Sequence, residues 1–183
     1  MDADDKPVEK AKKEKRKTSK IRSWIESILE AALIVLVMFC ICWPMQVHGD
    51  SMEHTFHSGD RVVISRVLVF FKQIKQGDIV VCKLAENGDK KDIIKRVIGV
   101  PGDEIVIRDG VVRVNGDILQ EDYVDGAETL GNMDVKLADD EYFVMGDNRA
   151  ISYDSRKAGP IHQRDMIGKV LFRFYPFGAM KAF

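Results

Sequence analysis

The 183-residue sequence has few cysteines, few prolines and no marked excess of either charge. Its three cysteines are Cys40, Cys42 and Cys82, and none has a neighbour at C-x-x-C spacing. This excludes the usual cysteine-based metal sites and a disulfide framework. We expect Cys82 to be a free, buried thiol, and we expect no metal and no cofactor.

The formal net charge of -1 hides two regions of opposite sign. Residues 1–22 carry nine Lys/Arg against five Asp/Glu, whereas residues 50–183 carry 19 against 22. A nucleic-acid-binding domain would carry its basic residues on the folded surface, so this distribution argues against a nucleic-acid partner. The tail is polar and lacks apolar periodicity, which predicts disorder over residues 1–22.

One long uncharged run follows the tail. Residues 31–47 read AALIVLVMFCICWPMQV. A helix from Ile25 to Val47 would be about 34 Å long at ~1.5 Å per residue, which is enough to cross a bilayer. Trp24 and Trp43 would then lie at its two interfaces. Because the Lys/Arg excess precedes the run, the positive-inside rule predicts a cytoplasmic N-terminus.

A cleaved signal peptide is the alternative interpretation of this run. Its only small-residue cleavage site, Val-His-Gly at 47–49, is a poor match to the A-x-A pattern, so a retained anchor is favoured. The predicted organisation is a cytoplasmic basic tail over 1–22, a transmembrane anchor over 23–47 and an extracytoplasmic domain over 48–183.

Beyond residue 49, the sequence has no long stretch with amphipathic-helix periodicity. Short Val/Ile-rich runs alternate with Gly-Asp, Asp-Gly and Asn-Gly turns, which predicts a mainly β domain built of antiparallel hairpins. The clearest hairpin joins 104–108 to 111–114 through Asp109-Gly110, a pair suited to a two-residue turn with positive φ. Further strands are expected at 61–66, 78–83, 93–100, 142–145 and 168–174.

The apolar run 67–71, Val-Leu-Val-Phe-Phe, is bounded by Arg66 and Lys72. It can be a buried strand, or it can dip into the lipid headgroup region. The sequence favours neither interpretation.

Two side chains suggest nucleophilic chemistry. Lys95 precedes Arg96 in the apolar run 92–100, and neighbouring residues of a strand point to opposite faces, so one base would face the core. A lysine buried in this way loses charge and can take a proton from a serine hydroxyl. By itself, however, the spacing fits an edge strand with both bases in solvent.

Ser51, in a Gly-Asp-Ser loop, is by itself equally consistent with an ordinary turn residue. Three histidines lie close to it in the sequence, but residues so near one another seldom form a catalytic triad. We interpret His48, His54 and His57 as surface loop residues.

Four segments, in order, resemble the bacterial type I signal peptidases, membrane-bound Ser-Lys peptidases that remove signal peptides from exported proteins. Residues 49–56 (GDSMEHTF) are similar to G-x-S-M-x-P-T-L, and residues 58–62 to a Gly-Asp strand segment. Residues 95–103 (KRVIGVPGD) match K-R-V-x-G-x-P-G-D fully, and 146–156 (GDNRAISYDSR) are similar to G-D-N-R-D-N-S-x-D-S-R. The resemblance covers nearly everything after residue 24.

The resemblance implies a role for each matched position. Ser51 matches the nucleophile and Lys95 the general base. Ser152 matches the hydroxyl that orients the lysine amine by hydrogen bonding, and Asp154 with Arg156 matches a supporting ion pair. No metal or cofactor is implied.

Several positions depart from the family pattern. Gly49 lies where some members add a hydroxyl to the oxyanion hole, so the backbone N–H of Ser51 would act without that side chain. His54 replaces the usual proline, and Ala150 and Ile151 replace polar residues. None of these changes removes a catalytic atom.

The implied substrates are secretory preproteins with small residues at positions -1 and -3, cleaved at the outer face of the cytoplasmic membrane and against lipid. Small residues require shallow apolar pockets. We expect the pocket walls in segments 52–56, 61–64 and 78–81, with these side chains: Met52, Phe56, Val62, Ile64 and Val80.

Three other functions fit the sequence less well. The departures at 54, 150 and 151 suggest a non-catalytic membrane-anchored assembly or chaperone protein, but such a protein would be expected to lose Ser51 or Lys95. A self-cleaving repressor would need an N-terminal DNA-binding domain in place of a tail and an apolar run. A Ser-His peptidase would lack the matched lysine signature.

Overall fold

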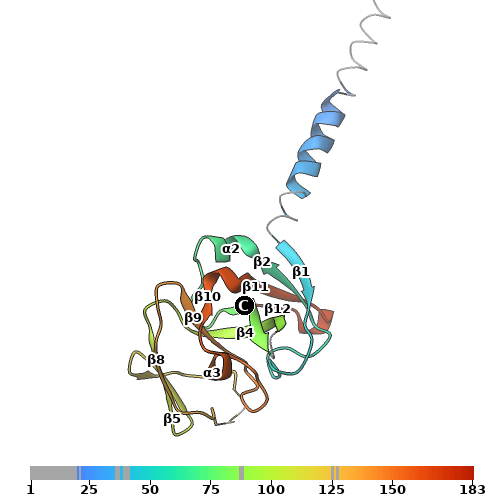
Figure 1. Ribbon diagram of the computed structural model, residues 1–183. Helices are drawn as coiled ribbons and strands as arrows, with labels where there is room; N and C mark the ends of the chain where they lie inside the picture. The colour runs from blue at the N-terminus through green and yellow to red at the C-terminus, as the bar shows by residue number, and fades with distance from the viewer. Residues whose placement is uncertain are drawn as a thin grey trace, which may run out of the picture. The chain divides into compact units, whose positions relative to one another are not determined.

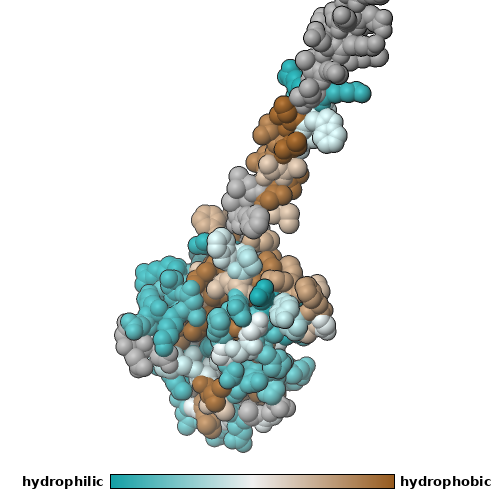
Figure 2. All heavy atoms as spheres, turned by 90° about the vertical axis from the view of Figure 1, so that its right-hand side faces the viewer, coloured by the Kyte–Doolittle hydropathy of each residue, from teal (hydrophilic) through white to brown (hydrophobic). Residues whose placement is uncertain are grey.

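The computed structural model describes residues 20, 22–35, 38, 42–86, 89–124, 126 and 128–183, which fall into two units, Met1–Ile41 and Cys42–Phe183. In the first unit, residues 22–35 are helical, and Figure 2 shows hydrophobic residues along this helix. Where the chain is described, no helix combines the length and the apolar character needed to cross a membrane. Residues 1–19 of the predicted tail and Cys40 lie outside the described residues.

The second unit begins earlier in the chain than predicted. Strand β1 (Cys42–Gln46) pairs antiparallel along its whole length with β2 (Arg61–Ser65), and Val47 is buried in the core. The predicted helix therefore does not extend to Val47. Pro44 explains the difference, because proline is unfavourable inside a helix but is tolerated in an edge strand such as β1.

The described strands of the second unit form two antiparallel sheets (Figure 1), which confirms the predicted mainly β class. The larger sheet has the order β1-β2-β11-β3-β4-β9-β10, with β12 beside β11, and the smaller has the order β7-β6-β5-β8. The remaining strands are β3 (Ile79–Glu86), β4 (Asp89–Gly99), β5 (Glu104–Arg108), β6 (Val111–Val114), β7 (Asp117–Ile118), β8 (Met133–Lys136), β9 (Glu141–Met145), β10 (Ile161–His162), β11 (Met166–Tyr175) and β12 (Lys181–Ala182). Short helices are α2 (Arg66–Phe70), α3 (Ser155–Ala158), η1 (Gln163–Asp165) and η2 (Phe177–Ala179).

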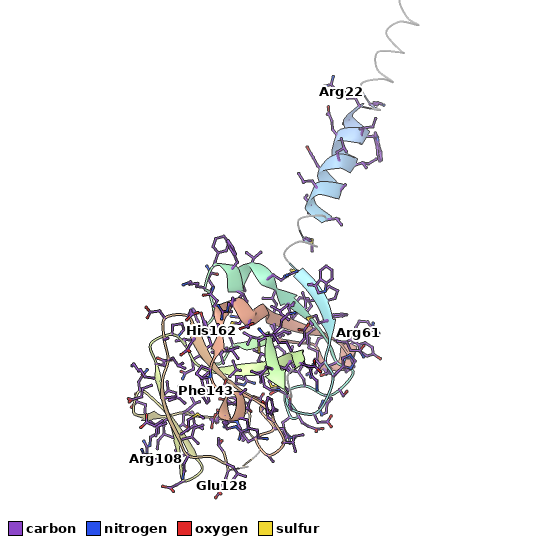
Figure 3. All side chains as sticks on the ribbon, in the orientation of Figure 1. Arg22, Arg61, Arg108, Glu128, Phe143 and His162 are labelled. Carbon is purple, nitrogen blue, oxygen red and sulfur yellow. The ribbon has the colours of Figure 1, made fainter. Side chains whose placement is uncertain are left out.

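The β5–β6 hairpin has the predicted bounds. Buried and more exposed residues alternate along both strands, so one face of the smaller sheet covers a core and the other faces water. Phe143 of β9 is fully buried in that core (Figure 3). Asp109 and Gly110 have φ values of 52° and 77°, as a two-residue turn of this kind requires.

The other predicted strands are present as β2, β3, β4, β9 and β11, with shifted ends. The run 67–71 is different, because most of it lies in the short helix α2, so its interpretation as a buried strand is wrong. Only Val69 of this run is buried, whereas Phe70 and Phe71 are exposed. Cys82 of β3 is free and buried, as predicted, and burial raises the pKa of its thiol to about 12.

Candidate active site

The serine and the lysine singled out in the sequence lie in contact. Ser51 belongs to the turn between β1 and β2, referred to below as the nucleophile turn (residues 48–60), and Lys95 belongs to the buried half of β4. Lys95 Nζ lies 2.6 Å from Ser51 Oγ and 3.0 Å from the backbone oxygen of Ile94. Both are hydrogen-bond distances, so the amine is placed to exchange a proton with the hydroxyl.

The environment of Lys95 favours its neutral form. The residue is 2% exposed. Burial lowers the pKa of the amine below its ordinary value, and the negative charges of Asp154 and Asp147 oppose this effect only in part. A larger fraction of Lys95 is therefore neutral near pH 7 than of an exposed lysine, and the neutral amine is the form that accepts a proton.

Hydrogen bonds donated by backbone N–H groups close the nucleophile turn at its base. Val47 N donates to Asp60 O at 2.8 Å, and Gly49 N donates to Ser58 Oγ at 3.3 Å. Gly49 has a φ of 81°, a conformation that glycine adopts without steric cost. Ser51 thus lies in a turn that is closed by hydrogen bonds. Gly49 has no side chain that could donate a hydroxyl beside Ser51.

His54, also in the nucleophile turn, has a φ of 79°. Proline is locked near -65°, so the proline of the resembled signature does not fit this backbone conformation. The replacement of the family's proline by His54 is therefore matched by a backbone conformation of the nucleophile turn that proline cannot adopt.

Replacing His54 by proline, the family's usual residue, is expected to lower kcat/KM by about tenfold or more, because small displacements of reacting groups are costly. His54→Gly is the comparison variant, and it is expected to retain the turn geometry and more activity than His54→Pro, since glycine adopts positive φ without steric cost. Cleavage assays and thermal unfolding of both variants test this. A His54→Pro protein that equals the wild type in both assays would contradict the turn geometry.

The loop of residues 146–152 lies against the nucleophile turn. Asn148 N donates to Ser51 O at 3.1 Å. A Cβ placed on Gly146 would lie 2.3 Å from Ser152 Oγ and 2.4 Å from Ser51 O, so this close approach requires glycine. Ser152 is buried, and among the described residues its Oγ makes no hydrogen bond to Lys95, so the implied bond is not formed. Its hydroxyl instead helps to lower the pKa of Asp154.

Gly146→Ala is expected to reduce kcat/KM by about 100-fold, because the new methyl group must displace the Ser51 backbone or the Ser152 side chain. Gly178→Ala is the matched control, since a Cβ there meets nothing within 4 Å. Kinetics of both variants, with circular dichroism to verify folding, measure the effect. Equal activity of the two variants would show that the loop tolerates a side chain at 146.

The implied supporting ion pair is present beside this loop. Arg156 Nε donates to Asp154 Oδ1 and Arg156 Nη2 to Asp154 Oδ2, both at 2.9 Å. Burial raises the pKa of Asp154, but the hydrogen bonds and charge of Arg156 outweigh this and hold that pKa below its usual value. Asp154 Oδ2 also accepts from Gly146 N at 3.0 Å, so the ion pair fixes the start of the loop that contacts Ser51.

A second buried ion pair was not anticipated from the sequence. Arg96 Nε and Nη2 donate to the two carboxylate oxygens of Asp147 at 2.9 and 2.7 Å, and Thr55 Oγ1 donates to Asp147 Oδ2 at 2.5 Å. The guanidinium carbon of Arg96 lies 3.9 Å from the centroid of the Tyr123 ring. This network joins β4, the nucleophile turn and the loop 146–152. The alternation of Lys95 and Arg96 along a strand was its only signal in the sequence.

A cavity of about 180 Å³ lies beside Ser51 and Lys95. Its other lining residues come from the end of β1, the nucleophile turn and the neighbouring strands: Met45, Gln46, Val47, His48, Val62, Val81, Asp92, Ile93 and Ile94. Only Val62 of the five predicted wall residues is among them. The other four fill the core instead, with their side chains fully buried: Met52, Phe56, Ile64 and Val80. His48 is exposed, as expected, but it also lines the cavity.

Residues 21–175 match the family model for "Signal peptidase, peptidase S26". The chain is 34% identical over 185 residues to signal peptidase I of Bacillus amyloliquefaciens, an alignment that covers 93% of this chain and 98% of the relative. It is also 34% identical to signal peptidase I S of Bacillus subtilis strain 168, with 90% of this chain and 95% of the relative covered. The crystal structure of a signal peptidase I from Enterococcus faecalis V583 matches with a TM-score of 0.45 and 27% identity, covering 52% of this chain and 94% of that chain. From its sequence, the chain belongs to the signal peptidase family, peptidase S26.

Proposed function

We propose that this chain is a serine endopeptidase that removes N-terminal signal peptides from secretory preproteins, with Ser51 as nucleophile and Lys95 as general base. The observation that carries the proposal is the 2.6 Å separation between Ser51 Oγ and the amine of a buried lysine. A non-catalytic assembly protein has no need of a base held against a hydroxyl, and no feature of the site favours that alternative.

The reaction begins when neutral Lys95 accepts the proton of Ser51 as Oγ attacks the scissile carbonyl. The tetrahedral intermediate carries an oxyanion, for which the backbone N–H of Ser51 is the proposed donor. Protonated Lys95 then gives its proton to the departing amine, which leaves an acyl-enzyme on Ser51. Lys95 next activates a water molecule, whose attack releases the signal peptide and regenerates the hydroxyl.

The cavity beside Ser51 is the proposed site for the substrate side chains next to the scissile bond. Its volume is about 180 Å³, and apolar groups of Met45, Val62, Val81 and Ile93 line it. This lining suits short apolar side chains, as expected for a preprotein with small residues at -1 and -3.

The apolar segment that precedes Cys42 is the proposed membrane anchor, with the basic tail in the cytoplasm and residues 42–183 outside. Its composition and the placement of the Lys/Arg excess support this orientation. β1 then runs from the anchor to the cavity, and its five residues extend about 17 Å at ~3.3 Å each. The site would thus act close to the outer membrane surface, where the cleavage site of a signal peptide emerges.

The proposal is tested by incubating the purified chain in detergent with a preprotein carrying an Ala-x-Ala site. Sequencing of the new N-terminus is expected to show one cut, directly after the second alanine. Changing that alanine to leucine is expected to stop cleavage. A protein that binds the preprotein without cutting it would favour the assembly function instead.

A further inference from the structure

The short helix α2 presents two aromatic rings to solvent. Phe70 is 78% and Phe71 63% exposed, and their rings meet edge-to-face with centroids 5.2 Å apart. Val69 is packed in the core beneath them, and Gln163 Nε2 donates to the backbone oxygen of Val69 at 2.9 Å. Because these contacts hold α2 in place, they also keep the rings of Phe70 and Phe71 facing solvent.

Basic residues predominate around these rings. Residues 66–75 read RVLVFFKQIK, with three basic residues and no acidic one. Arg66, Lys72 and Lys75 are all exposed. A groove beside α2 is lined by two basic residues, Arg66 and Arg164, and by one acidic residue, Asp140. Exposed aromatic rings among basic side chains form a surface that suits an anionic phospholipid interface.

The position of α2 in the fold points to the same partner. Cys42, the first residue of β1, pairs with Ser65, the residue directly before α2. The helix therefore begins beside the first residue of β1, which follows the N-terminal apolar segment in the sequence. Trp43, one residue further along β1, is 54% exposed.

We propose that α2, with Phe70, Phe71 and the basic residues around them, is a second membrane contact that binds the surface of a bilayer containing anionic phospholipid. The inference rests on the proposed function in one respect, the anchoring of the segment before Cys42. Two attachment points restrict the rotation of the catalytic unit about its anchor.

The test uses the full chain with both native tryptophans changed to phenylalanine and a single reporter introduced by Phe70→Trp. Ile118→Trp is the matched control, because Ile118 is an apolar residue, 52% exposed, in β7 of the smaller sheet. Figure 1 shows this sheet at the end of the catalytic unit away from α2. Both proteins are placed in nanodiscs with brominated lipids, either zwitterionic or rich in phosphatidylglycerol.

Fluorescence of the reporter at 70 is expected to be quenched several-fold more than that at 118, and more strongly in the anionic discs. Arg66→Gln with Lys72→Gln is expected to bring quenching at 70 toward that of the control. Equal quenching at 70 and 118 in anionic discs overturns the proposal. So does quenching at 70 that appears only after a protein partner is added, because the surface would then be a protein-binding site.

Two further measurements separate this proposal from the peptidase function. Cleavage of the preprotein in detergent by the Phe70→Trp protein reports on the dyad alone and is expected to equal that of the wild type. If the full chain does not float with lipid at all, both the anchor and the α2 contact are overturned, while cleavage in detergent still supports the peptidase.

Discussion

Lys95→Met is expected to lower kcat/KM by about 10⁴-fold or more, a loss comparable to that seen when a member of a catalytic unit is removed. Methionine keeps the length and apolar body of lysine, so packing in β4 is preserved. What disappears is the only amine within hydrogen-bond distance of Ser51 Oγ among the described residues. The loss is therefore expected in kcat, with little change in substrate binding.

Stability distinguishes this loss from simple unfolding. Because burial disfavours the charged amine, removing it is expected to leave the free energy of unfolding unchanged or slightly raised near pH 7. Lys83→Met, at an exposed position in the neighbouring strand β3, is the matched control and is expected to retain activity. A folded Lys95→Met enzyme that retains activity would argue against Lys95 as the base.

The second large effect concerns pH. Since burial lowers the pKa of Lys95, kcat/KM is expected to rise with pH and to level off below the value of about 10.4 that an exposed lysine has. Below the pKa of Lys95 in the folded enzyme, each pH unit reduces the neutral fraction, and with it the rate, about tenfold. Measuring kcat/KM from about pH 5 to about pH 10, below the ordinary lysine pKa, with a substrate that does not titrate there tests this.

The same pKa shift has a consequence for stability, with a definite sign. Between the unfolded and the lowered folded pKa of Lys95, the unfolded chain binds more protons than the folded one, so this group makes stability rise with pH. Its contribution is most unfavourable below the folded pKa and vanishes above the unfolded one. The free-energy difference between Lys95→Met and wild type is therefore expected to grow as pH falls through that window. A difference independent of pH would mean that Lys95 is not desolvated.

The features that could be predicted from the sequence are those that local signals specify. The β5–β6 hairpin was predicted with its bounds because alternation and Asp109-Gly110 act over neighbouring residues. The pairing of Ser51 with Lys95 could not be derived from spacing, since 44 residues separate them. It was implied by the family resemblance, and the 2.6 Å contact agrees with it.

The features that could not be predicted depend on partners distant in the chain. β1 was assigned to the membrane span because its composition is apolar, but β2 and the burial of Val47 determine its structure. A buried strand was one of two interpretations of the run 67–71, because Val and Phe favour strands, but in α2 only Val69 is buried in the core. The cavity wall was misassigned for a related reason. Position in a segment does not tell which side chains the neighbouring strands cover, and Ile64 and Val80 are covered completely.

The most direct test of the central claim is cleavage of the Ala-x-Ala preprotein by Ser51→Ala beside the wild type, at equal concentration in the same detergent. The account predicts that the wild type cuts after the second alanine and that the variant, still folded, gives no product above the uncatalysed background. Cleavage at the same site by Ser51→Ala, at a rate close to that of the wild type, would contradict it.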